Sequence, residues 1–112
     1  RVAGWRHDAA KGPSEPSAVL AYHLGRMVAA CRAAGAEPLL LTYPEDLGAL
    51  GSAAPTVARE QGVTLIDCGP EFAARLGKLP RAELFVADGH CTERGYGVMA
   101  LVAARALRGR LK

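Results

Sequence analysis

The stretch that decides the fold runs from Leu84 to Leu107 and reads LFVADGHCTERGYGVMALVAARAL. Thr92 is suited to cap a helix that begins at Glu93, because a hydroxyl accepts a hydrogen bond from the first turn and an acidic side chain there complements the helix dipole. Apolar residues then recur at helical spacing, so one face of this helix is expected to lie on a core. These residues are Tyr96, Met99, Val102, Ala103 and Leu107.

Asp88 and His90 lie in the loop before this helix, with only Gly89 between them. A loop that runs into a helix keeps its side chains accessible while the helix holds it in place. A nearby carboxylate can accept the imidazole Nδ1–H, which fixes the tautomer and leaves Nε2 free as a base. Asp88 and His90 are therefore the candidate catalytic residues.

Upstream of this loop, strand and helix patterns alternate. The sequence predicts strands that include residues 1–5, 38–43 and 63–67, and helices over residues 15–34, 55–61 and 71–76. Alternating elements with short connections predict an α/β fold with a parallel sheet and helices on both of its faces.

Ligands of such sheets bind beyond the carboxyl ends of the strands. The segments expected at this edge are Gly4-Trp5, Tyr43-Pro44, Asp67-Cys68 and the loop with Asp88 and His90. Asp67 has two interpretations there, a catalytic residue or a cap for the turn at Gly69 and Pro70. The convergence is a second reason to expect a site at the loop with Asp88 and His90.

The run Asp88-Gly89-His90, followed by Gly95-Tyr96 and an Ala- and Leu-rich final helix, resembles the last block of the SGNH (GDSL-like) hydrolases. In that family the Asp and His of a Ser-His-Asp triad sit together before the C-terminal helix, usually spelled Asp-x-x-His. The resemblance implies a three-layer α/β/α fold with a parallel sheet, of the flavodoxin-like SGNH type. It also implies hydrolysis of a small-molecule carboxylic ester without a metal or organic cofactor, with His90 as general base and Asp88 orienting it.

The resemblance covers residues 1–112 as a single domain that would correspond to the C-terminal half of the family domain. The first strands and the Gly-Asp-Ser nucleophile block have no counterpart, since Ser14, Ser17 and Ser52 are the only serines and none has that context. The strand at Val2 is then expected to present an unpaired apolar edge, through which the chain would self-associate.

Three other interpretations remain open. A non-catalytic flavodoxin-like or receiver-like binding module would fit the order of elements, although it predicts a phosphate-cradling Gly-rich loop or an acidic cluster that the sequence lacks. Asp88, His90 and Cys91 would be metal ligands if the loop curls. In the plainest interpretation, Asp88 only caps a turn and His90 is a solvated loop residue.

Composition excludes several classes of protein. The net charge of +3 comes mostly from Arg scattered along helices, and no basic and aromatic pattern of a nucleic-acid surface accompanies it. No apolar run approaches the length that a bilayer requires. Three widely spaced cysteines without a CxxC pair predict neither a zinc ribbon nor a disulfide scaffold, although Cys91 beside His90 is a candidate reactive thiol.

Overall fold

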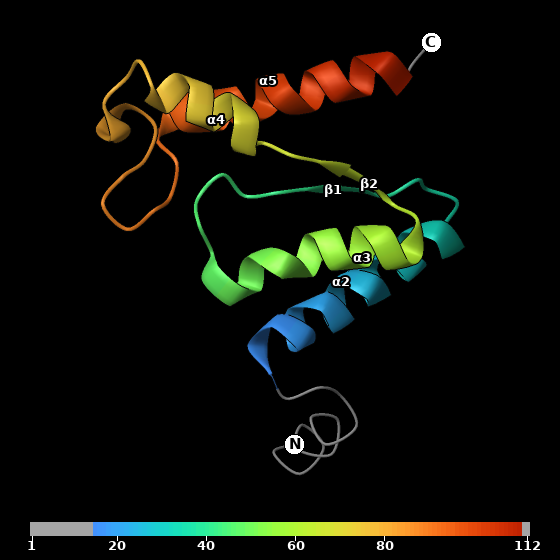
Figure 1. Cartoon of the computed structure of the whole chain (residues 1–112). Helices are drawn as coiled ribbons and strands as arrows, with labels where there is room; N and C mark the ends of the chain where they lie inside the picture. The colour runs from blue at the N-terminus through green and yellow to red at the C-terminus, as the bar shows by residue number, and fades with distance from the viewer. Residues whose placement is uncertain (1–14, 111–112) are drawn as a thin grey trace. The chain divides into compact units, whose positions relative to one another are not determined.

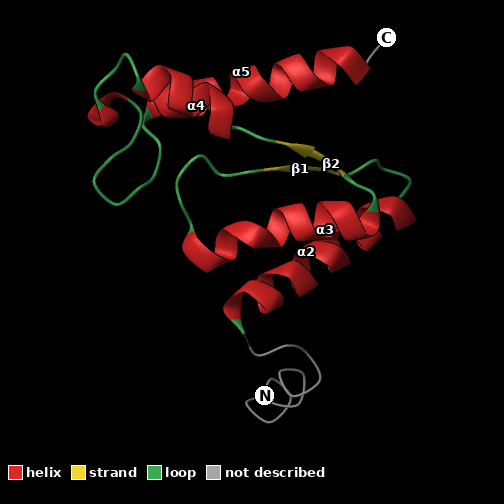
Figure 2. Ribbon diagram, viewed as in Figure 1, coloured by secondary structure: helices red, strands yellow, loops and turns green. Residues whose placement is uncertain are grey.

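The computed structural model describes residues 15–110, so the strand expected at residues 1–5 and its edge at Val2 lie outside the described residues. Helices and strands alternate along the chain (Figures 1 and 2). In chain order the elements are α2 (Pro16–Ala33), β1 (Leu39–Leu41), the 3₁₀ helix η1 (Gly48–Ser52), α3 (Ala53–Gln61), β2 (Thr64–Ile66), α4 (Gly69–Leu76), the 3₁₀ helix η2 (Arg81–Glu83) and α5 (Glu93–Arg110). The predicted α/β class is confirmed, with β1 and β2 paired in a two-stranded parallel sheet.

The helices begin close to where the sequence places them. α2 begins at Pro16, and Gly35 just beyond its end takes a left-handed φ of +79°, as a helix stop requires. α3 begins at Ala53, two residues before the predicted start, and α4 begins at Gly69, also two residues early. In both helices a proline lies in the first turn, where its missing N–H leaves no helical hydrogen bond unmade.

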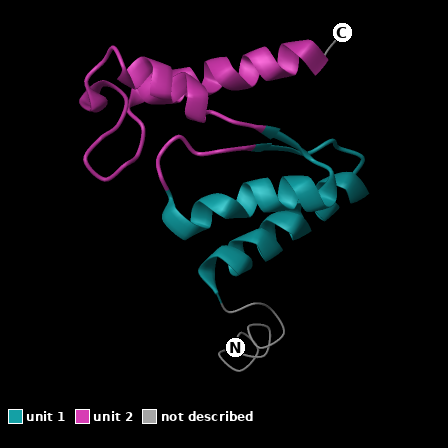
Figure 3. Ribbon diagram, in the orientation of Figure 1, with its two compact units in different colours: residues 1–40, 47–65 teal, residues 41–46, 66–112 magenta. Residues whose placement is uncertain are grey.

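The chain divides into two compact units, coloured separately in Figure 3. Unit 1 contains residues 1–40 and 47–65, of which 15–40 and 47–65 are described, and unit 2 contains residues 41–46 and 66–112, described as far as 110. The chain passes between the units inside the two strands, because Leu41 and Ile66 belong to unit 2 while the earlier residues of β1 and β2 belong to unit 1.

Unit 1 is built from α2 and α3 packed on each other. Its buried centre consists of Val28 from α2, Val57 from α3 and Val63 before β2. The Arg32 guanidinium also donates to the Gly62 carbonyl at 3.3 Å, which joins the end of α2 to the end of α3. The unit is therefore held by a small aliphatic core.

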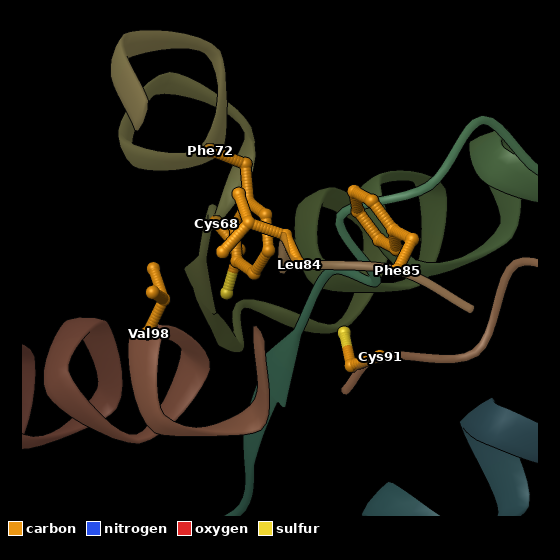
Figure 4. Close-up of a cluster of buried hydrophobic side chains, with 6 residues drawn as sticks. All are labelled: Cys68, Phe72, Leu84, Phe85, Cys91 and Val98. Atoms are coloured by element: carbon orange, nitrogen blue, oxygen red, sulfur yellow. The ribbon is translucent and has the colours of Figure 1, made fainter. Parts of the chain in front are cut away.

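Unit 2 contains a second core, which includes Phe85 and Cys91 on either side of the loop with Asp88 and His90. Figure 4 shows Phe72 beside Cys68 and Leu84, with Val98 reaching toward them from α5. Leu84 and Cys68 are fully buried, at 0% exposure. The Phe72 and Phe85 rings lie with centroids 5.5 Å apart, a spacing at which aromatic pairs add to the energy of burial.

The face of α5 on this core differs in part from the predicted one. Met99 and Val102 pack against the core as expected, with Val98 buried at its centre. Tyr96, however, is 49% exposed and Leu107 39% exposed, so their predicted placement on the core face is wrong. The reason is that Gly95 and Val98, three residues apart, are buried together and turn Tyr96 outward. None of the described helices has the length and hydropathy to cross a membrane.

Candidate active site

The loop of residues 86–90 is closed by backbone hydrogen bonds. Phe85 and Cys91 form an isolated antiparallel bridge at its base. Above the bridge, the Val86 N–H donates to the His90 carbonyl at 2.8 Å and the Gly89 N–H donates to the Val86 carbonyl at 3.0 Å. Gly89 takes a φ of +91°, which only glycine adopts without strain, so the turn requires it.

Asp88 and His90 meet in this loop as predicted. The imidazole Nδ1 lies 2.9 Å from Asp88 Oδ1, and the His90 backbone N–H donates to the same oxygen at 3.1 Å. An ionised carboxylate can only accept hydrogen bonds, so Nδ1 carries a proton, and whenever the ring is neutral Nε2 keeps its lone pair. The His90 side chain is 71% exposed, which opens the ring to a reactant.

Two hydrogen bonds from His90 keep Asp88 ionised. They lower the pKa of Asp88 below its ordinary value of 3.8, first through the backbone N–H of His90 and then through its imidazole. Asp88 is itself 69% exposed, so water screens the attraction between the two side chains. The arrangement therefore orients the imidazole more than it stabilises a charge.

Tyr43, two residues beyond β1, contacts the loop. The Tyr43 hydroxyl donates to the Gly89 carbonyl at 2.8 Å, and Cys91 Sγ lies 3.7 Å from the Tyr43 hydroxyl oxygen. Burial, together with the Cys91 thiol, raises the pKa of Tyr43 to about 12, so the phenol remains a donor at any physiological pH. The sequence placed Tyr43 at this edge only as the end of a strand, and its contact with Gly89 was not predicted.

Glu45 contacts the other side of the turn. Its carboxylate forms an ion pair with Arg81, and a Cβ added to Gly89 would lie 3.2 Å from Glu45 Oε2. The Arg81 guanidinium in turn lies 4.5 Å from the centroid of the Phe85 ring. Gly89 is thus required for its backbone conformation, whereas a Cβ at this position would need the Glu45 side chain to shift by a few tenths of an ångström.

Thr92 caps α5 as the sequence predicted. Its hydroxyl oxygen accepts the Gly95 N–H at 3.1 Å, and its O–H donates to the Glu83 carbonyl at 2.7 Å. One side chain therefore satisfies a free N–H of the helix and ties the helix start to η2. It positions the loop without offering a group for chemistry.

Asp67 caps the turn that begins α4. It accepts the Gly69 N–H at 2.9 Å and the Thr42 hydroxyl at 3.2 Å. Of its two interpretations, the structural one is therefore confirmed. The Thr42 hydroxyl oxygen also accepts the Cys68 N–H at 2.9 Å, so this contact joins the ends of both strands.

Cys91 is buried in the core of unit 2, whereas the His90 side chain is exposed. Its side chain is only 6% exposed, and its sulfur lies 3.9 Å from Met99 Sδ inside the core of unit 2. The structure therefore does not support Cys91 as the accessible reactive thiol that its position beside His90 made it a candidate for. Burial of Cys91 also removes it from the proposed ligand set, and no three His, Cys, Asp or Glu side chains among residues 15–110 gather as metal ligands.

The serines of the described chain make local contacts in unit 1. Ser17 donates to Glu15 at 3.1 Å, and Ser52 donates to the Ala49 carbonyl at 3.0 Å. Ser14 lies outside the described residues.

Comparison with models of protein families gave no match, and comparisons with curated proteins and with solved structures gave none either.

Proposed function

We propose that this chain carries the Asp-His part of a Ser-His-Asp triad in an SGNH-type serine hydrolase that cleaves carboxylic esters. The observation that carries the proposal is the contact of 2.9 Å between His90 Nδ1 and Asp88 Oδ1 on an exposed ring. In a triad the carboxylate fixes the tautomer of the imidazole and leaves Nε2 free as the base, and Asp88 and His90 provide this part of the triad.

In the proposed reaction His90 acts first as a general base and then as a general acid. Nε2 takes the proton of a serine hydroxyl as its oxygen attacks the ester carbonyl, and then returns that proton to the leaving alcohol. Water repeats the sequence on the acyl-enzyme, with His90 again as base. Asp88 stays ionised throughout, accepts the Nδ1–H and stabilises the imidazolium that forms in each step.

The serine is the part of this proposal that the sequence does not contain. It would come from a Gly-Asp-Ser segment joined to this chain in a three-layer α/β/α domain with further parallel strands. Two contacts of unit 2 support a site at this edge. The hydroxyl of Tyr43, two residues beyond β1, bonds to the loop, and Asp67, directly beyond β2, bonds to Thr42. Both contacts lie just beyond the carboxyl ends of the strands, where ligands of α/β sheets bind.

The test begins with the coding sequence upstream of Arg1, in which a strand followed by Gly-Asp-Ser is expected. The protein with that segment should hydrolyse aryl acetates and react with a fluorophosphonate at the serine. His90→Ala should reduce kcat by about 10⁴-fold or more, because a triad without its base loses most of its rate enhancement. His23→Ala is the matched control, since His23 is an exposed residue of α2, and it should leave the rate unchanged.

Two results would contradict the proposal. One is an upstream sequence without any nucleophile block, and the other is a hydrolytic rate that His90→Ala leaves at the wild-type level. Saturable binding of FMN by a chain without esterase activity would instead favour the flavodoxin-like binding module.

A further inference from the structure

One peptide group in the loop of residues 86–90 forms hydrogen bonds through both its carbonyl and its N–H. The peptide between Gly89 and His90 contributes its carbonyl to the Tyr43 hydroxyl at 2.8 Å. The same peptide contributes its N–H to Asp88 Oδ1 at 3.1 Å. Because a peptide group is planar, the direction of its carbonyl determines the direction of its N–H.

The consequences extend to the imidazole. Asp88 Oδ1 receives both the N–H of this peptide and the Nδ1–H of His90. A rotation of the peptide that moved its N–H away would leave the carboxylate held by the ring alone, on a side chain that is 69% exposed. A hydrogen bond to the carbonyl also polarises the peptide and strengthens its N–H as a donor.

Tyr43 is well placed to hold this peptide. Its ring packs against the buried core of unit 2, while Pro44 follows directly and limits the conformations of the backbone at Tyr43. The Cys91 thiol, 3.7 Å from the hydroxyl, is a more distant and weaker acceptor than the Gly89 carbonyl. The phenolic proton is therefore directed to Gly89.

We propose that Tyr43 is a positioning residue, whose hydroxyl orients the Gly89–His90 peptide and so holds Asp88 against the Nδ1 of His90. Its consequence for ester hydrolysis rests on the proposed function, whereas its effect on the geometry of the pair does not. Tyr43 touches no reacting atom in this role. It acts through the backbone on the residue that selects the tautomer.

The experiment compares Tyr43→Phe with Tyr22→Phe in the chain labelled with ¹⁵N-histidine. Tyr22 is the matched control because it is an exposed tyrosine of α2. Long-range ¹H–¹⁵N spectra, recorded where the imidazole is neutral, give the ratio of the Nδ1–H and Nε2–H tautomers of His90. Tyr43→Phe should shift this ratio about fivefold toward Nε2–H, since one hydrogen bond to the peptide is lost, and Tyr22→Phe should not shift it.

A second readout is the pKa of the Asp88 carboxyl, followed by ¹³C NMR. It should rise toward 3.8 in Tyr43→Phe, because the backbone N–H of His90 is the largest cause of its lowering. A merely structural role for Tyr43 would lower the melting temperature and move neither readout. Tyr43→Leu, which also lacks a donor, is a second variant for the same measurements, and Asp88→Asn calibrates the full loss of the tautomer preference.

The proposal is overturned if either folded, donor-free variant keeps the wild-type tautomer ratio and Asp88 pKa. Both readouts are measured without a substrate or a serine. A protein that fails to hydrolyse esters but shows the expected shifts would therefore overturn the proposed function and leave the role of Tyr43 standing.

Discussion

Gly95, in the first turn of α5, lies directly against the backbone carbonyl of Leu84. A Cβ at position 95 would overlap that oxygen and would lie 2.9 Å from Cys91 Cβ. Leu84 and Cys91 lie on either side of the loop of residues 86–90, and the Thr92 N–H donates to the Leu84 carbonyl at 2.9 Å. The absence of a side chain at Gly95 therefore sets how closely α5 approaches the base of that loop.

Gly95→Ala should destabilise the chain by about 1–3 kcal/mol or more, because the overlapping partner is backbone and can move only by shifting the loop. Gly97→Ala is the matched control in the same helix, since no atom lies within 4 Å of a Cβ there. It should stabilise the chain by about 0.5–1 kcal/mol, as expected when alanine replaces glycine inside a helix. Urea unfolding of both variants measures the difference, and equal stabilities would contradict the close approach.

Removal of the Thr92 hydroxyl should loosen the start of α5. Thr92→Val keeps the shape of the side chain but loses its hydrogen bonds with the Gly95 N–H and the Glu83 carbonyl. We expect a loss of about 1–2 kcal/mol in the free energy of unfolding, as for other caps. Thr92→Ser retains the hydroxyl and should lie within about 0.5 kcal/mol of wild type. A loss in Thr92→Ser as large as that in Thr92→Val would contradict the assignment of this stability to the hydroxyl.

Asp88 should titrate below its ordinary pKa of 3.8, because two hydrogen bonds from His90 favour its ionised form. A carboxyl whose pKa is depressed by folding contributes stability above its unfolded pKa and loses it as the pH falls through the lower folded value. The Asp88–His90 contact should therefore persist from neutral pH down to about pH 4 and disappear only below that. ¹³C NMR of the carboxyl group measures the midpoint.

The same titration separates the two hydrogen bonds. His90→Ala removes the imidazole but keeps the backbone N–H, which is the larger cause of the lowered pKa. The midpoint of Asp88 should therefore rise in this variant and still remain below 3.8. A midpoint at or above 3.8 in the wild-type chain would remove the hydrogen bonds on which the pair depends.

The chain should self-associate through its sheet. In residues 15–110 the sheet has two strands, so each has an outer edge that no third described strand covers, and such edges pair with other chains. Sedimentation velocity should show a mass that rises with concentration. Leu41→Lys, at a residue of β1 that is 39% exposed, should reduce this association. Met27→Lys, on the exposed side of α2, is the control, and a monomer at every concentration would contradict the prediction.

Local patterns in the sequence predicted the elements and the central contact of the site. The cap at Thr92, the stop at Gly35 and the prolines in the first turns each depend on residues within one helical turn. Asp88 and His90 are two residues apart, and their contact closes within a single tight turn. Such features could be predicted because their hydrogen bonds join neighbours in the chain.

Contacts between distant residues could not be predicted in this way. Tyr43 and Gly89 are 46 positions apart, and nothing in the spacing of either segment indicates that one hydroxyl meets that carbonyl. The exposure of Tyr96 and the burial of Cys91 depend likewise on how closely α5 approaches Leu84. An apolar repeat indicates that a helix has a buried side but does not locate its centre to within one residue.

The sequence by itself determined the α/β order of elements and brought a carboxylate beside an imidazole, because both follow from short-range spacing and local hydrogen bonds. The tertiary structure alone decided which side chains support that pair. The Tyr43 hydroxyl bonds to the Gly89 carbonyl, and the Glu45 side chain also lies close to Gly89. The lack of a side chain at Gly95 lets the Leu84 carbonyl lie close to α5. These contacts are the outcome of packing the whole of unit 2 at once, in which many weak, non-directional interactions select one arrangement that no short stretch of sequence specifies.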